Sequence, residues 1–115
     1  MPSTTDQLTA IYDAFNVRDV ERVLSAMALD VDWPNGWEGG RVVGHEAVRE
    51  YWRRQWEAID PKVTPVGFTE LPDGRMRVQV HQVVHDREGR LLADTQVVHT
   101  YLFADGLVQA MEIEG

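Results

Sequence analysis

Three histidines, His81, His85 and His99, are the side chains best suited to proton chemistry in this chain. His99 lies in an alternating segment beside Val97 and Tyr101, which places it on a buried strand face. An imidazole there can donate, accept or shuttle a proton near neutral pH. His99 is therefore the first candidate for an acid/base group or an oxyanion donor. The alternative is a core histidine satisfied by a tyrosine or a backbone carbonyl.

His81 is the second candidate, because the expected pairing of the strands puts it on the same face as His99 with Gln79 nearby. It would orient a polar substrate group, although solvent or Asp94 would hold the ring equally well. His81 and His85 have the spacing of helical metal ligands. On a strand, however, four residues span about 13 Å, too far for one ion. No metal site is predicted.

Aromatic side chains predict a wall for a flat ligand, and packing in an ordinary core explains each of them taken alone. Gly36, Gly39 and Gly40 lack the strand-to-helix order of a phosphate loop, so we expect the rim of a pocket and no nucleotide. The aromatic set is Tyr12, Trp33, Trp37, Trp52 and Trp56.

Length and composition predict one domain over residues 1–115. Nineteen acidic against eleven basic side chains give a formal charge of −8, which disfavours nucleic acid and anionic lipid surfaces as partners. The absence of cysteine excludes disulfides and agrees with a reducing compartment. No secretion signal and no apolar run approaching ~20 residues is present, so we expect a cytoplasmic protein.

Two kinds of periodicity divide the chain. Ser3 is suited to cap a first helix and Asp19 a second, and a third helix is predicted from about His45 to Ile59, stopped by Asp60-Pro61. A short strand over residues 31–33 and a glycine-rich loop reaching residue 44 lie between the second and third helices. Beyond residue 61 the period changes to two and predicts antiparallel strands near 62–71, 75–86, 90–103 and 107–114.

The turn at residues 86–89 decides which side chains share a face, because a slip of one residue exchanges the two faces of a strand. A type I turn with a glycine bulge pairs residue 86 with residue 90 and places Gln79 opposite Val97. A three-residue loop over 104–106 then places Met111 opposite His99. The resulting face gathers Gln79, His81, Val83, Thr95, Val97, His99, Tyr101, Phe103, Gln109, Met111 and Ile113.

Both faces of this sheet are too apolar for water, yet three helices cover only one. We therefore expect the outer face to form a symmetric homodimer. Two-residue turns in place of the bulged ones would reverse the faces and weaken the dimer argument. Arg77, Gln79, His81 and His85 would then lie outside.

Four segments carry a family resemblance by their order: Phe15-Asn16-Val17-Arg18-Asp19, Val31-Asp32-Trp33-Pro34, Gly44-His45-Glu46-Ala47-Val48-Arg49-Glu50-Tyr51-Trp52, and Val98-His99-Thr100-Tyr101-Leu102-Phe103-Ala104-Asp105-Gly106. They resemble the SnoaL-like polyketide cyclase and ketosteroid isomerase branch of the NTF2-like superfamily, over nearly the whole chain. The resemblance implies an α+β cone in which three N-terminal helices pack on a strongly curved, mainly antiparallel sheet around an apolar pocket. It also implies a usual dimer and a membership of isomerases, cyclases, hydrolases and plain binding domains.

The resemblance transfers only in part to individual residues. Steroid isomerases abstract the substrate proton with a carboxylate before the proline of the first strand, and that position is Trp33 here. Their oxyanion tyrosine matches Ile11, which leaves Tyr12 one residue away. His99 matches their second oxyanion donor, and Met111 matches an apolar pocket wall. A standard ketosteroid isomerase is therefore not expected.

Three hypotheses follow. The first is an isomerase, cyclase or hydratase without a cofactor, acting on a small apolar carbonyl compound with His99 as acid/base or oxyanion donor and with His81, Gln79 and Tyr101 positioning the substrate. The second is a ligand-binding domain, because Asp32, the nearest carboxylate to the missing base, should point out of the pocket. The third is an assembly module whose outer sheet face is the functional surface.

Overall fold

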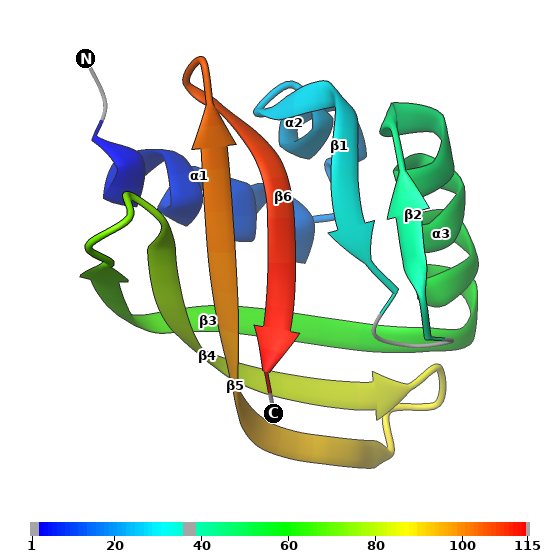
Figure 1. Cartoon of the computed structure of the whole chain (residues 1–115). Helices are drawn as coiled ribbons and strands as arrows, with labels where there is room; N and C mark the ends of the chain where they lie inside the picture. Colours follow the sequence, from blue (N-terminus) through cyan, green and yellow to red (C-terminus); the bar gives the residue numbers. More distant parts are fainter. Residues whose placement is uncertain (1–2, 36–38, 115) are drawn as a thin grey trace.

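One curved six-stranded sheet organises the chain, in the computed structural model that describes residues 3–35 and 39–114 (Figure 1). Gly36 and Trp37, of the predicted rim and aromatic wall, lie outside the described residues. The strand order is β2-β1-β6-β5-β4-β3. The elements are α1 (Thr4–Asn16), α2 (Val20–Leu24), β1 (Met27–Pro34), β2 (Arg41–Val43), α3 (His45–Ala58), β3 (Ile59–Glu70), β4 (Met76–Asp86), β5 (Leu91–Ala104) and β6 (Leu107–Glu114).

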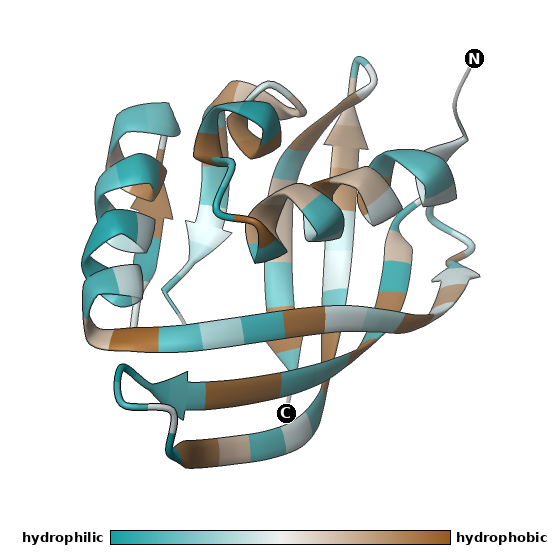
Figure 2. Ribbon diagram, turned by 180° about the vertical axis from the view of Figure 1, so that it is seen from behind, coloured by the Kyte–Doolittle hydropathy of each residue, from teal (hydrophilic) through white to brown (hydrophobic). Residues whose placement is uncertain are grey.

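The helices lie together on one face of the sheet, which Figure 2 shows from their side. All neighbouring strands pair antiparallel except β1 and β6, which pair in parallel. The predicted α+β class with a mainly antiparallel sheet is therefore confirmed. None of the helices in the described residues has the length and apolar character needed to cross a bilayer.

Local capping signals act as the sequence predicts. The Ser3 hydroxyl accepts a hydrogen bond from the Asp6 amide at 3.1 Å, and the Asp6 side chain caps the Ser3 amide in return. The Asp19 carboxylate accepts from the Arg22 amide at the start of α2. Each interaction satisfies an amide that lacks a partner within its helix.

Two element boundaries and one additional strand differ from the prediction. Strand β1 begins at Met27, four residues earlier than predicted, because α2 ends after five residues. Strand β2, within the predicted loop, is too short at three residues to show a period of two. The residues expected to stop the third helix, Asp60-Pro61, already belong to β3. Strand β3 is an edge strand, so the amide hydrogen that Pro61 lacks does not interrupt a ladder.

The β4–β5 turn has the predicted form, and a second irregularity changes the faces beyond it. The Asp86 amide donates to the Arg90 carbonyl at 2.8 Å, and Gly89 takes the positive φ of a glycine bulge. Strand β5 then carries one extra residue at Leu92, between the pairs Val84–Ala93 and His85–Leu91. This bulge moves the rest of the register by one residue.

The consequence is that His99 pairs with Val78, whereas Gln79 pairs with Val98. Val78 is fully buried and Gln79 is exposed, so the inward face of β4 is the opposite of the predicted one. The prediction that Gln79 and His81 share a face with His99 is wrong. For β4 the structure shows the alternative with reversed faces, in which Gln79 and His81 lie outside.

The β5–β6 connection is a two-residue turn, not the predicted three-residue loop. Asp105 and Gly106 both have positive φ, as in the type I′ hairpin turns that match the twist of strands. A further irregularity near Phe103 leaves Tyr101 paired with Met111. Met111 therefore faces Tyr101 and not His99, but all three side chains share the inward face as predicted.

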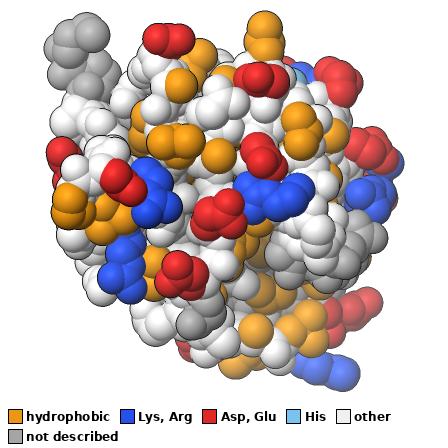
Figure 3. Space-filling model, viewed as in Figure 1, with side chains coloured by type: hydrophobic (Ala, Val, Ile, Leu, Met, Phe, Trp, Pro, Cys, Tyr) orange, Lys and Arg blue, Asp and Glu red, His pale blue; other side chains and the backbone are white. Residues whose placement is uncertain are grey.

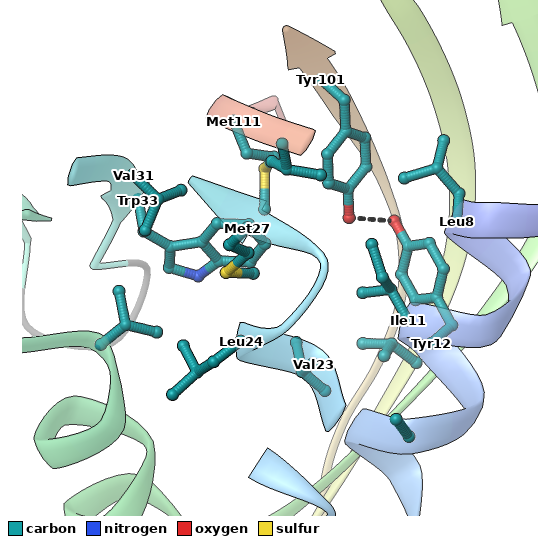
Figure 4. Close-up of a cluster of buried hydrophobic side chains, with 14 of the residues drawn as sticks. Leu8, Ile11, Tyr12, Val23, Leu24, Met27, Val31, Trp33, Tyr101 and Met111 are labelled. Carbon is teal, nitrogen blue, oxygen red and sulfur yellow. Dashed lines mark hydrogen bonds between the residues drawn. The ribbon is translucent and has the colours of Figure 1, made fainter. Parts of the chain in front are cut away.

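Buried side chains between the helices and the sheet form one core, part of which Figure 4 shows. The helices contribute Leu8, Val23 and Leu24 to it, and β1 contributes Met27 and Val31, all almost completely buried. These residues belong to the core cluster that packs the helices against the inward face of the sheet.

Candidate functional site

A cavity of about 380 Å³ lies between the helices and the inward face of the sheet. This volume is in the range of small-molecule sites. Residues of the three helices, β1 and the strands β3 to β6 line it, and most are apolar or aromatic. The polar or hydrogen-bonding side chains among the described lining residues are Tyr12, Trp33, Tyr51, Gln55, Gln82, His99 and Tyr101.

Three of these side chains form a buried hydrogen-bonded chain. The Tyr101 hydroxyl donates to the Tyr12 hydroxyl at 2.8 Å, and the Tyr12 oxygen lies 2.7 Å from Nδ1 of His99. Figure 4 shows the Tyr101–Tyr12 contact. The rings of Tyr12 and His99 are nearly parallel, with an interplanar angle of 12°. None of the three residues is more than 6% exposed.

The directions of these bonds and the tautomer of the imidazole depend on each other. When Tyr12 accepts from Tyr101, its own hydrogen is directed to Nδ1 of His99, which then acts as the acceptor. In a neutral imidazole the other nitrogen then carries the hydrogen. No described residue forms a hydrogen bond with Nε2. In this arrangement His99 offers an N–H donor, at a side chain that lines the cavity.

Burial keeps all three groups neutral at physiological pH. It lowers the pKa of His99 to about 4, because the imidazolium is poorly solvated in this site. Burial raises the pKa of Tyr12 far above its usual range, with the neighbouring Tyr101 adding to the effect. Burial also raises the pKa of Tyr101. The site thus works with neutral donors and acceptors.

The aromatic wall that the sequence predicts is present in part. Trp33 and Trp52 line the cavity and meet edge to face, with ring centroids 5.6 Å apart. Trp56 does not line it. The Trp56 ring packs against Phe15 and Trp52, and the Arg18 guanidinium lies 5.2 Å from its centroid. Trp56 therefore supports the wall from behind, which corrects its prediction as a ligand contact.

Gln79 and His81 lie on the outer face of the sheet, away from the cavity. His81 Nε2 lies 2.6 Å from an Asp94 carboxylate oxygen, and both side chains are more than a third exposed. The Gln79 amide lies against Gly67 of β3. The structure thus shows the alternative in which Asp94 holds His81. The prediction that Gln79 and His81 contact the substrate beside His99 was wrong. The Leu92 bulge puts these two side chains on the opposite face of the sheet from His99.

Asp32 points out of the cavity, as strand alternation predicts. Its carboxylate accepts from Arg41 Nε at 2.8 Å. The same guanidinium donates to the carbonyls of Asp32 and Met111, so it joins β1 to β6. None of the described lining residues is a carboxylate. Nor do the described residues include three His, Cys, Asp or Glu side chains arranged to hold a metal ion.

Three polar lining residues, Tyr51, Gln55 and Gln82, were not among the predicted site residues. Gln55 follows Trp52 by three residues on α3, and this helical spacing was a usable signal. Its amide donates to the Tyr51 hydroxyl at 3.4 Å. Gln82 gave no comparable signal, because its direction depends on the Leu92 bulge.

Comparison with known proteins identifies the family. The model of the SnoaL-like domain matches residues 8–111. Among proteins with curated descriptions, none is similar enough in sequence to count as a match. The structure of TerC co-crystallised with polyporic acid is 29% identical with a TM-score of 0.82, covering 95% of this chain and 88% of TerC.

Two further solved structures have the same fold as this chain. An NTF2-like protein of unknown function from Burkholderia pseudomallei is 28% identical with a TM-score of 0.83, covering 96% of this chain and 88% of its own. A Catenulispora acidiphila protein with a ketosteroid isomerase-like fold, in complex with trimethylamine, has a TM-score of 0.84 at 13% identity, covering 98% and 87%. Two of these three neighbours thus hold small molecules. The chain belongs to the SnoaL-like branch of the NTF2-like superfamily.

Proposed function

We propose that this protein is an enzyme that needs no cofactor and transfers a proton on an apolar carbonyl compound, in the manner of an isomerase, cyclase or hydratase. The observation that carries the proposal is the neutral His99, held by Tyr12 within an apolar cavity. Its Nε2 would exchange a proton with the carbon atom next to the carbonyl group, and a hydroxyl of the same network would donate to the carbonyl oxygen. In a site with few charges such hydrogen bonds are stronger than in water.

The shape and composition of the cavity favour an aromatic ligand. Trp33 and Trp52 offer ring surfaces, and Met111 adds an apolar wall next to Tyr101. TerC, 29% identical over most of this chain, was crystallised with polyporic acid. Polyporic acid is therefore the first compound to test as a ligand of this cavity.

The test has a binding arm and a turnover arm. Polyporic acid should quench tryptophan fluorescence, because Trp33 and Trp52 line the cavity. For turnover, deuterium uptake at the methylene group of 1-phenyl-2-propanone in D₂O, followed by proton NMR, reports proton abstraction next to a carbonyl. We expect wild-type protein to accelerate uptake over buffer. His99→Ala should lose this acceleration and keep most of the binding, as for a catalytic group.

A ligand-binding domain without turnover is the second candidate, and the lack of a carboxylate among the described lining residues favours it. The two functions differ in the outcome of the same experiment. Binding of polyporic acid with deuterium uptake no faster than in buffer would support the second. Equal loss of binding and turnover in His99→Ala would also favour a binding role for the imidazole.

A homodimer through the outer sheet face stays a proposal. Exposed apolar side chains on β3 and β5 support it, among them Val66 at 58% and Leu102 at 43% exposed. Figure 3 shows that acidic and basic side chains are interspersed with the apolar ones on the side seen there. A sedimentation mass of two chains at micromolar concentration is expected, and a monomer mass would contradict the proposal.

A further inference from the structure

We propose that Tyr101, Tyr12 and His99 form a proton relay, which takes a proton from a carbon atom of the substrate at one end and returns one to the carbonyl oxygen at the other. The relay rests on the proposed function and names its chemistry. The reaction is a keto–enol shift within one neutral molecule, and the substrate class is a neutral apolar ketone with an acidic C–H next to its carbonyl group.

The geometry provides a chain with two ends at one cavity. Its two inner contacts, 2.8 Å between the tyrosine oxygens and 2.7 Å from Tyr12 to Nδ1, are ordinary hydrogen-bond lengths. His99 and Tyr101 both line the cavity, with ring centroids 6.3 Å apart. The relay requires that one small substrate contacts Nε2 of His99 and the Tyr101 hydroxyl together.

The chain has two hydrogen arrangements, because each inner oxygen or nitrogen can donate or accept. In the first, Tyr101 donates to Tyr12, Tyr12 donates to Nδ1, and Nε2 carries a hydrogen. In the second, Nδ1 donates to Tyr12, Tyr12 donates to Tyr101, and the Tyr101 hydrogen points into the cavity. Nε2 then has a free electron pair. The two arrangements differ only in the positions of hydrogens.

The reaction converts the second arrangement into the first. Nε2 takes the proton from the substrate carbon as that C–H bond breaks. The electron pair of the C–H bond forms the carbon–carbon double bond of the enol. Nδ1 releases its proton to Tyr12, Tyr12 passes its own to Tyr101, and Tyr101 delivers its own to the carbonyl oxygen. One proton leaves the substrate and one arrives, so the protein gains and loses none.

Burial explains why a neutral relay suits this site better than separate ionic steps. A single base would become an imidazolium, and a single acid would become a phenolate. Burial disfavours both ions, since it lowers the pKa of His99 to about 4 and raises the pKa of both tyrosines. Within the described lining residues there is no carboxylate to compensate an imidazolium. A concerted shift passes through neither ion.

The kinetic test separates the relay from two independent groups. Tyr101→Phe removes one end, and Tyr12→Phe interrupts the middle but leaves Nε2 and the Tyr101 hydroxyl in place. The relay predicts that each variant slows deuterium uptake into 1-phenyl-2-propanone by about 100-fold or more, with polyporic acid binding retained. The double variant should be no slower than either single one, because the groups act as a unit.

His81→Gln, on the outer face of the neighbouring strand, is the control and should exchange at the wild-type rate. Tyr12→Phe within about threefold of wild type, with Tyr101→Phe slow, would overturn the relay and leave the proposed enzyme intact. Multiplicative losses in the double variant would overturn it as well. Circular dichroism and thermal melting establish whether each variant is folded. If only one of the two single variants folds, its exchange rate is still compared with that of the wild type.

A second measurement needs no substrate, so it still tests the relay if no ketone reacts. Nitrogen-15 NMR of labelled histidine distinguishes the two tautomers of His99. Wild-type shifts should lie between those of the pure tautomers, since both arrangements exist. Tyr101→Phe should show only the Nε2–H form, because Tyr12 then has no acceptor other than Nδ1. Identical His99 shifts in wild type and Tyr101→Phe would overturn the relay.

Discussion

His99 and His81 lie on neighbouring strands of one sheet and face opposite environments. His99 is 6% exposed, and its partner is a tyrosine hydroxyl. The His81 side chain is 38% exposed, and its partner is the carboxylate of Asp94. The histidine–carboxylate pair thus lies on the surface, whereas the buried histidine has only neutral partners. The face on which a strand places an imidazole decides the chemistry open to it.

This contrast is a property of the β4–β5 register. The extra residue at Leu92 turns His99 and Tyr101 inward together with Val78, and it turns His81 outward. Without the bulge, His81 and His99 would share a face, as the sequence predicts. A single inserted residue therefore separates the polar network of the cavity from the surface ion pair.

The largest effect that sharpens the comparison is on turnover. His99→Ala should lower the rate of deuterium uptake about 10²–10⁴-fold, the range of a single acid–base group. His81→Ala should leave it within twofold, because His81 lies outside the cavity. Proton NMR with 1-phenyl-2-propanone measures both. Comparable losses in the two variants would show that the cavity is not the reaction site.

The second effect is on the pH dependence of stability. Burial lowers the pKa of His99 from its ordinary value of 6.5 to about 4, so between these two values the unfolded chain binds a proton that the folded chain does not. Stability should therefore rise with pH between about 4 and 6.5, with His99 contributing about 3 kcal/mol across that window.

Urea unfolding of wild type and His99→Gln at several pH values measures this contribution. The difference in unfolding free energy between the two proteins should increase from pH 4.5 to pH 7. His81→Gln controls for the loss of one imidazole on the opposite face of the sheet. A difference that stays constant with pH would mean that folding leaves the pKa of His99 unchanged.

The third effect concerns the hydroxyl between the two ends of the buried network. Tyr12→Phe leaves Nδ1 of His99 and the Tyr101 hydroxyl without their partner, which should cost about 1–3 kcal/mol of stability. Tyr101→Phe leaves the Tyr12–His99 bond in place and should cost about 1 kcal/mol. Urea unfolding at pH 7.5 measures both, and a reversed order would contradict the assigned chain of bonds.

The smallest effect is expected on the outer face. A double-mutant cycle with His81→Ala and Asp94→Ala should give a coupling free energy below about 1 kcal/mol, because exposed ion pairs are screened by water. The cycle uses urea unfolding at pH 6 in low salt. A coupling larger than the cost of Tyr12→Phe would break the comparison, since the exposed pair would then be the stronger one.

The sequence predicts well where the signal is local. Ser3 and Asp19 cap their helices through neighbouring amides, and the Asp86–Arg90 turn forms as expected from its glycine. The bulge at Leu92 has no such signal, because neither its composition nor its spacing differs from a regular strand. One unpredicted residue was enough to misplace Gln79 and His81.

The sequence predicted which residues belong to the candidate site better than it predicted the hydrogen bonds between them. His99, Tyr12 and Tyr101 are all predicted site residues that line the cavity. Their hydrogen-bonded order was not predicted, because Tyr12 and His99 are 87 residues apart and only the folded sheet brings them together. Trp56 was predicted as a site residue but does not line the cavity. Helical spacing places it on the inner face of α3, but spacing does not show that Trp52 lies between it and the cavity.

Strand β6 lies between β5 and β1, so β1 and β2 join the remaining strands only through it. On the ribosome, β6 is translated after every other element of the sheet. A nascent chain that ends before residue 107 therefore holds two strand groups with no ladder between them, and each exposes an open edge. We expect the native hollow to close only after β6 leaves the exit tunnel, which makes late truncations a risk for aggregation.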